Sequence, residues 1–164
     1  MTNIRRYYSD CYTYFVTNVT IQRLPILRDN ENLLLDAIEK HKTATGADIM
    51  AWAILPDHFH LLIHTPNTNI SLLMRKIKLS FSTNYRQQNN LRQGRLWQYR
   101  FWDHIIRNQD DMNRHFDYIH RNPVKHGLVD NSFEYPYSSI HNYRELYPDD
   151  WGAKEEDSDF EYGE

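Results

Sequence analysis

The stretch Ile54–Asn67, ILPDHFHLLIHTPN, decides the fold. Side chains of a β-strand point alternately to opposite faces, so Phe59 and Leu61 share one face while His58 and His60 project from the other. Histidine suits a strand of this kind only where its ring nitrogens bind something, and imidazole is a common ligand of divalent metals. The pattern therefore predicts a strand with one core-facing side and one side that presents two imidazoles.

The segments on both sides of this strand predict alternating strands and helices. Residues 12–20 are rich in aromatic and β-branched residues, which is typical of a strand, and apolar residues recur at helical spacing in three other segments. A proline after Asn122 disfavours helical dihedrals at that residue, so we expect the last helix to end there. The expected elements are strands over 12–20, 48–55 and 58–65, an extended segment over 96–106, and helices over 30–46, from Asn69 or Ser71 to about 88, and over 108–122.

This order indicates an α+β protein with a ferredoxin-like (RRM-like) βαββαβ antiparallel sheet and one added C-terminal helix. We expect helices on one face of the sheet and an open second face that carries His58 and His60. On this view Trp97, Tyr99 and Phe101 alternate as the buried side of the last strand. Ser82 is expected on the polar face of the second helix.

Composition limits the class of protein. The chain has 164 residues and one cysteine, Cys11, so an internal disulfide framework and a cysteine zinc cluster are excluded. No apolar run approaches the ~20 residues of a membrane span, and the stretch MTNIRRYYSD has no signal-peptide core. We expect a soluble, cytoplasmic protein with one domain over residues 1–152 and an acidic, disordered tail over 153–164.

Charge divides the chain into a basic body and an acidic end. Residues 1–128 carry a net charge of +6, whereas residues 129–164 carry −9. Eight of the basic residues lie between Arg75 and Arg107 against one acid, Asp103, which favours an anionic partner for the body. A solvated surface would give the same pattern.

The expected third helix carries a second group of reactive side chains. Tyr118 and Asn122 are four residues apart and share a helix face, and His115 lies on the same side. Met112, Phe116 and Ile119 form an apolar face that can dock the helix. The arrangement suggests a nucleophile beside a metal, with His115 either a base or a packing residue. A surface tyrosine and an ordinary helix stop remain the alternative.

Three motifs together resemble a known family. LPDHFHLLI is similar to the histidine-hydrophobe-histidine (HUH) motif of single-strand DNA transposases, and LWQYRFWDHIIRN followed by FDYIHRNPVKHGLV resembles the signature of REP-associated tyrosine transposases. The resemblance implies that His58 and His60 bind the metal, that Tyr118 is the nucleophile, and that Asn122 is the third metal ligand. It also implies Mg²⁺ or Mn²⁺ as cofactor and single-stranded DNA with REP-type hairpins as substrate.

Cleavage in such a family proceeds through a 5′-phosphotyrosine. A metal ion neutralises a phosphate oxygen, the tyrosine attacks phosphorus, and a 3′-hydroxyl is released. Basic side chains would contact the DNA phosphates. The residues expected in this role are Arg5, Arg6, Arg75, Lys78, Arg86, Arg95, Arg100, Arg107 and Lys125.

Two other functions fit the same residues. A ferredoxin-like sheet can serve as a non-catalytic platform for single-stranded nucleic acid, and a metal nuclease that uses water would keep the histidines without a covalent adduct. Tyr118 distinguishes the three. The sequence leaves open whether the protein is a monomer or a homodimer, and whether the tyrosine acts on its own chain or on a partner's.

Overall fold

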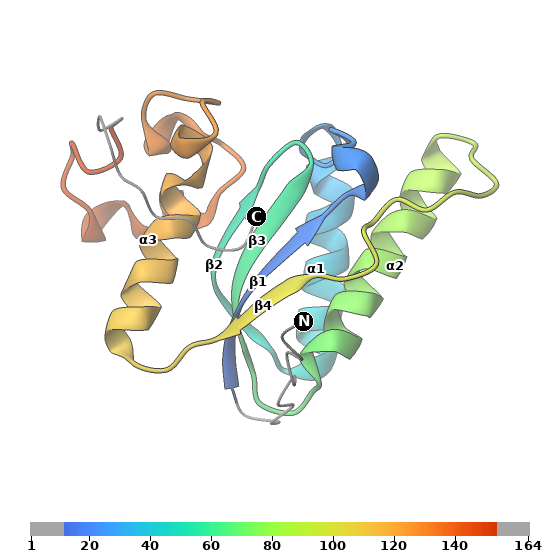
Figure 1. The fold of residues 1–164 in the computed structure, drawn as a ribbon, viewed down its shortest axis with the longest axis horizontal. Coiled ribbons are helices and arrows are strands. Elements are labelled where there is room, and N and C mark those ends of the chain that lie inside the picture. The colour runs from blue at the N-terminus through green and yellow to red at the C-terminus, as the bar shows by residue number, and fades with distance from the viewer. Residues whose placement is uncertain (1–11, 154–164) are drawn as a thin grey trace, which may run out of the picture.

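A four-stranded antiparallel sheet forms the centre of the molecule (Figure 1), in a computed structural model that describes residues 12–153. The strands are β1 (Tyr12–Val19), β2 (Asp48–Ile54), β3 (His58–Thr65) and β4 (Trp102–Ile105), in the order β2-β3-β1-β4. Central β1 pairs with β3 and with β4, and this register places Thr17 opposite His60. The order and pairing confirm the ferredoxin-like α+β fold.

Two helices cover one face of this sheet (Figure 1). Helix α1 (Glu31–Thr45) ends at Gly46, which takes the left-handed conformation, and α2 (Ile70–Gln88) begins at Asn69, whose side chain accepts hydrogen bonds from two backbone amides. Alternate strand residues, Phe59 and Leu61 among them, form the main core with the apolar sides of both helices. The expected core face of β3 is therefore confirmed.

The second face is covered as well, which corrects the expectation of an open face. Helix α3 (Gln109–Lys125) lies across it (Figure 1), and Ile119 packs there with Phe15 and Leu62. Ala51 and Ala53 of β2 lie in the same cluster, and their small side chains let the helix backbone approach the sheet closely. Burial of α3 on these strands leaves His58 and His60 with 2% and 0% exposure.

Helix α3 also continues past the residue expected to end it. Pro123 lies inside the helix, which runs on to Lys125. A proline inside a helix has no amide hydrogen to donate to the carbonyl four residues earlier, and its ring crowds that carbonyl, so the end of α3 must be stabilised by other contacts. Gly127 takes a φ of +67° and closes the end: its amide bonds to the Val124 carbonyl at 2.9 Å, and the Leu128 amide to the Pro123 carbonyl at 2.9 Å.

Three further details differ from expectation. In the segment 96–106 only Trp102–Ile105 forms a strand, preceded by a bridge between Thr20 and Trp97. Tyr99 is 87% exposed, so it is not a core residue, although Trp97 and Phe101 are buried. Ser82 is buried and accepts a hydrogen bond from Nε1 of Trp97 at 3.0 Å.

Short 3-10 segments complete the described chain: Ile21–Arg23, Arg28–Asn30, Ser132–Glu134 and Ser139–Leu146. The last of these packs aromatic rings on α3, with Phe116 at 4.8 Å from Tyr143 between ring centroids. Ala153, which the sequence assigned to the tail, bridges to Asn131. Arg5, Arg6 and the acidic tail from 154 onward lie outside the described residues. Within residues 12–153 no helix is long and apolar enough to cross a membrane.

Candidate active site

The two histidines of β3 are buried side by side, and each ring is held through Nδ1. Nδ1 of His58 donates to Oδ1 of Asp57 at 2.6 Å, and Nδ1 of His60 shares a 2.8 Å hydrogen bond with Oγ1 of Thr17. The ring centroids are 5.0 Å apart. A fixed Nδ1 leaves Nε2 as the nitrogen that can bind a ligand, as in many metal-bound histidines.

Asp57 is well suited to orient His58. Burial acts to raise the pKa of Asp57, but hydrogen bonds from His58 and Arg23 outweigh it and lower the pKa below the ordinary value. The carboxylate therefore stays charged and fixes the tautomer of the ring it touches.

Tyr118 comes from α3 and lies against the histidines of its own chain. Its ring centroid is 5.6 Å from that of His60 and 5.8 Å from that of Phe15, and the residue is 6% exposed. Asn122, one turn further along the helix, is fully buried. The structure thus brings the tyrosine helix to the HUH strand within one chain, an arrangement that the sequence left open.

The donor atoms at this place fit a divalent metal. In the described residues, seven buried side-chain nitrogen and oxygen atoms take part in no hydrogen bond, and they include Nε2 of His58, Nε2 of His60 and Oδ1 of Asn122. Burying such an atom is costly unless a ligand or ion meets it. Two imidazole nitrogens and one amide oxygen form a donor set that Mg²⁺, Mn²⁺ and Zn²⁺ all accept.

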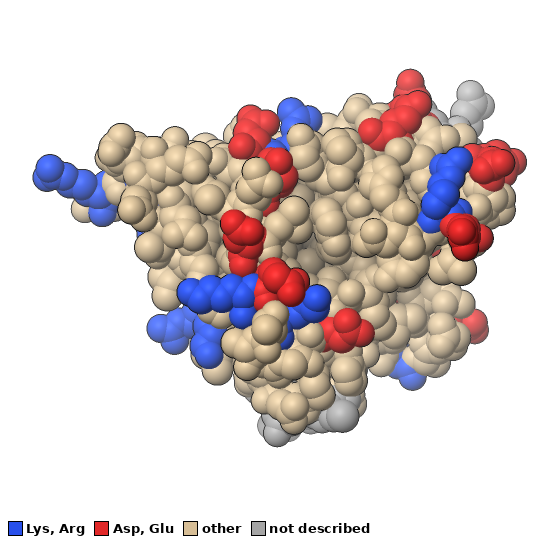
Figure 2. Space-filling model, turned by 180° about the vertical axis from the view of Figure 1, so that it is seen from behind, with Lys and Arg blue, Asp and Glu red and all other residues tan. Residues whose placement is uncertain are grey.

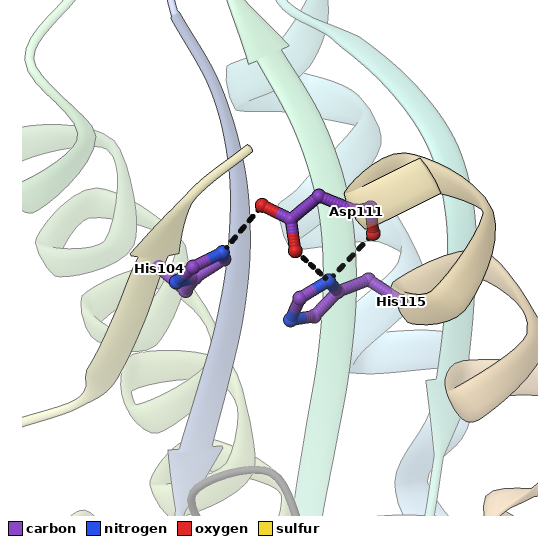
Figure 3. A group of neighbouring side chains, drawn as sticks. All are labelled: His104, Asp111 and His115. Carbon is purple, nitrogen blue, oxygen red and sulfur yellow. Dashed lines mark hydrogen bonds and ion pairs between the residues drawn. The ribbon is translucent and has the colours of Figure 1, made fainter. Parts of the chain in front are cut away.

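A second cluster, His104–Asp111–His115, lies where β4 meets the start of α3 (Figure 3). Nε2 of His104 donates to Oδ2 of Asp111 at 2.8 Å, and Nδ1 of His115 is 3.2 Å from Oδ1 and donates to the Asp111 carbonyl at 2.8 Å. One potential ligand atom from each residue lies within 4.8 Å of the others, so the group is compatible with a metal ion.

Arg107 competes for the same carboxylate. Its backbone amide and its Nε donate to Oδ2 of Asp111 at 3.0 and 3.2 Å. Burial acts to raise the pKa of Asp111, but the hydrogen bonds from His104 and Arg107 outweigh it and hold that pKa well below the ordinary value. The pKa of His115 is also lowered, in this case by burial of the ring. We interpret the cluster as the junction that fixes the start of α3.

Sequence reasoning missed this cluster. It gave His104 no role beyond a possible phosphate contact and treated His115 as a base or a packing residue. The usable signal was the spacing of Asp111 and His115, four residues apart on one helix face. Contact with His104, however, depends on how α3 meets β4, which spacing does not show.

The expected DNA-contacting residues that lie within the described chain come from both sides of the sheet. Arg75, Lys78 and Arg86 belong to α2, on the side of the sheet opposite α3 (Figure 1). On the face shown in Figure 2, basic and acidic side chains are interspersed. Arg107 lies just before α3 and contacts Asp111, whereas Lys125 is in the last turn of α3 and contacts Tyr118.

Several of these cations already have contacts within the chain. Arg86 donates to the Gly94 carbonyl, and the Arg95 guanidinium lies 3.7 Å from the centroid of the exposed Tyr99 ring. The Lys78 ammonium is 5.5 Å from the centroid of Phe101. Arg75 and Arg100 are exposed.

Comparisons with known proteins agree with this geometry. The family model of IS200-like transposases matches residues 7–122. A REP-associated tyrosine transposase of Escherichia coli K12 is 38% identical over 100% of this chain and 98% of its own length. The structure of a REP-associated tyrosine transposase bound to a REP hairpin superposes with a TM-score of 0.84 at 36% identity, covering 100% of this chain and 98% of that one.

The matched span contains the HUH strand and ends at Asn122. Both matches cover nearly the full length of the relative, so the similarity concerns the whole described fold rather than one motif. The chain therefore belongs to the IS200-like transposase family and, within it, to the REP-associated tyrosine transposases.

Proposed function

We propose that this transposase cleaves and rejoins single-stranded DNA next to REP-type hairpins through a covalent bond between Tyr118 and a DNA 5′-phosphate. The observation that supports it most is the position of Tyr118, whose ring meets that of His60 in a buried site beside Asn122. A related transposase is known bound to a REP hairpin. Action on DNA of this kind supports a cytoplasmic location for the proposed reaction.

His58, His60 and Asn122 would hold Mg²⁺ or Mn²⁺ through Nε2, Nε2 and Oδ1. Such an ion, when bound, neutralises a non-bridging phosphate oxygen and makes phosphorus more electrophilic. Asp57 and Thr17 keep the two imidazoles oriented for it.

The chain's own residues then carry out a transesterification. Oη of Tyr118 forms a bond to phosphorus as the bond from phosphorus to the 3′-oxygen breaks; the phenol proton passes to solvent, and the 3′-oxygen takes up a proton. One phosphodiester replaces another, so a 3′-hydroxyl can reverse the step without ATP. One chain contains all four residues, so a monomer or either subunit of a homodimer has a complete site.

The test uses a 5′-tailed REP-type hairpin DNA, with and without Mn²⁺ or Mg²⁺, analysed by denaturing gel and peptide mass mapping. We expect a metal-dependent adduct on Tyr118 that Tyr118→Phe abolishes, while Tyr12→Phe at the start of β1 still forms it. Cleavage without an adduct would instead indicate a nuclease that uses water. Binding without cleavage on several hairpins would favour a non-catalytic module.

A further inference from the structure

Three functional side chains lie along one stripe of α3. Tyr118, Asn122 and Lys125 stand at positions i, i+4 and i+7, which is the spacing of residues on one helix face. Lys125 reaches this stripe because the helix continues through Pro123 for two more residues. The glycine turn at Gly127 then closes the helix and fixes the last turn, from which Lys125 projects.

The lysine side chain reaches back along the helix to the tyrosine. Nζ of Lys125 is 3.3 Å from Oη of Tyr118, within hydrogen-bond distance, and 5.0 Å from the centroid of the ring. Helical side chains lean toward the N-terminus, which directs a lysine two turns later toward the tyrosine. A lysine ammonium has three donors and no acceptor, so it donates to the phenol oxygen.

We propose that Lys125 is a catalytic residue that donates a hydrogen bond to Oη of Tyr118 and stabilises negative charge on that oxygen during strand cleavage. The proposal rests on Tyr118 being the nucleophile. In the forward step the ammonium stays charged while the phenol proton passes to solvent and Oη bonds to phosphorus. In the reverse step a 3′-hydroxyl attacks the phosphotyrosine, and the same donor stabilises the departing phenolate.

The rival role for Lys125 is the phosphate contact that its charge suggested. A phosphate contact contributes to DNA affinity and leaves the chemical step of bound DNA unchanged. Contact with the reacting oxygen has the opposite signature: it changes the rate at saturating DNA with little effect on affinity.

The experiment measures the single-turnover rate of adduct formation at saturating hairpin DNA, and the dissociation constant of the same DNA. For Lys125→Gln we expect a rate about 10- to 100-fold lower and an affinity within about 3-fold of the parent, since one charged donor to a reacting oxygen is lost. Lys125→Arg should recover most of the rate. Lys42→Gln on α1, an equal loss of charge on the far side of the sheet, should change neither.

A substrate with a bridging 3′-sulfur at the scissile phosphate shows which oxygen the lysine serves. A thiolate leaves without assistance, so a lysine acting on the leaving group would become dispensable, and full recovery of Lys125→Gln on this DNA would overturn the proposal. A deficit that persists supports action on the nucleophile. An unchanged maximal rate with weakened binding would reduce Lys125 to a phosphate contact. A parent protein that forms no adduct at all would instead refute the proposed role of Tyr118, on which this proposal rests.

Discussion

Replacing Asp111 by asparagine removes the one acidic group of the junction between β4 and α3. The Asp111 side chain is 3% exposed. Its Oδ2 accepts hydrogen bonds from Nε2 of His104 at 2.8 Å and from the backbone amide and Nε of Arg107 at 3.0 and 3.2 Å. An amide can keep its oxygen at the Oδ2 position, but it loses the negative charge, and its nitrogen then lies at the Oδ1 position, 3.2 Å from Nδ1 of His115, which is also a donor. We therefore expect Asp111→Asn to lower the free energy of unfolding by about 3 kcal/mol.

The pH dependence of this loss has a defined sign. The pKa of Asp111 is lowered in the folded protein, so its contribution to stability is complete above the unfolded-state pKa of ~3.9 and decreases as the pH falls below it. The stability difference between the parent and Asp111→Asn should therefore shrink by about 1 kcal/mol between pH 5 and pH 3.

The assay is urea unfolding followed by circular dichroism at pH 7, 5 and 3. Asp110→Asn is the matched control, because Asp110 is exposed in the same first turn of α3 and shares its favourable interaction with the helix dipole. Equal unfolding free energies for the two variants, within about 0.5 kcal/mol, would refute the reasoning. So would a parent-to-variant difference that does not change with pH.

Two further predictions concern Thr17, which contacts His60, and Gly127, which closes α3. Thr17→Val removes the hydrogen bond to Nδ1 of the buried His60 and should weaken Mn²⁺ binding, measured by calorimetry, by about 10- to 100-fold. The control is the affinity for the hairpin in metal-free buffer, which should not change. Undiminished Mn²⁺ binding would mean that Thr17 does not orient the ring. Gly127→Ala puts a side chain on a residue with φ +67° and should lower the free energy of unfolding in urea by about 1–2 kcal/mol. An added Cβ meets nothing within 4 Å, so this loss would come from backbone strain rather than from a clash. A loss below about 0.3 kcal/mol would show that the turn tolerates alanine.

Local patterns predicted the elements that depend on them. Alternation along β3 placed His58 and His60 on one face because the period of a strand is fixed by its backbone. The helical spacing of Tyr118 and Asn122 likewise placed them together, and the start of α2 at Asn69 was one of the two positions that the sequence allowed. All of these follow from neighbours within one turn or one strand.

Features that depend on packing were not predictable in this way. Ala51 and Ala53 allow α3 to close over the sheet, yet alanines in a strand do not indicate which helix will cover them. Pro123 disfavours a helix locally, but the Gly127 turn and the contact of Leu128 with the second core cluster stabilise two more residues of α3. Tyr99 follows the alternation of its neighbours and is still exposed, because the chain before β4 pairs only at Trp97.

The attachment of α3 at both ends limits how far Tyr118 can move. Its first turn is fixed to β4 through Asp111, and its later turns are held by rings of the C-terminal segment, with His120 bonded to Oη of Tyr147 at 2.8 Å. A helix anchored in this way cannot carry a covalently attached strand from one location to another without breaking one of its anchors. In the mechanism proposed for Tyr118, the tyrosine would thus be the stationary point during an exchange of strands, and the incoming 3′ end of the DNA would have to come to it.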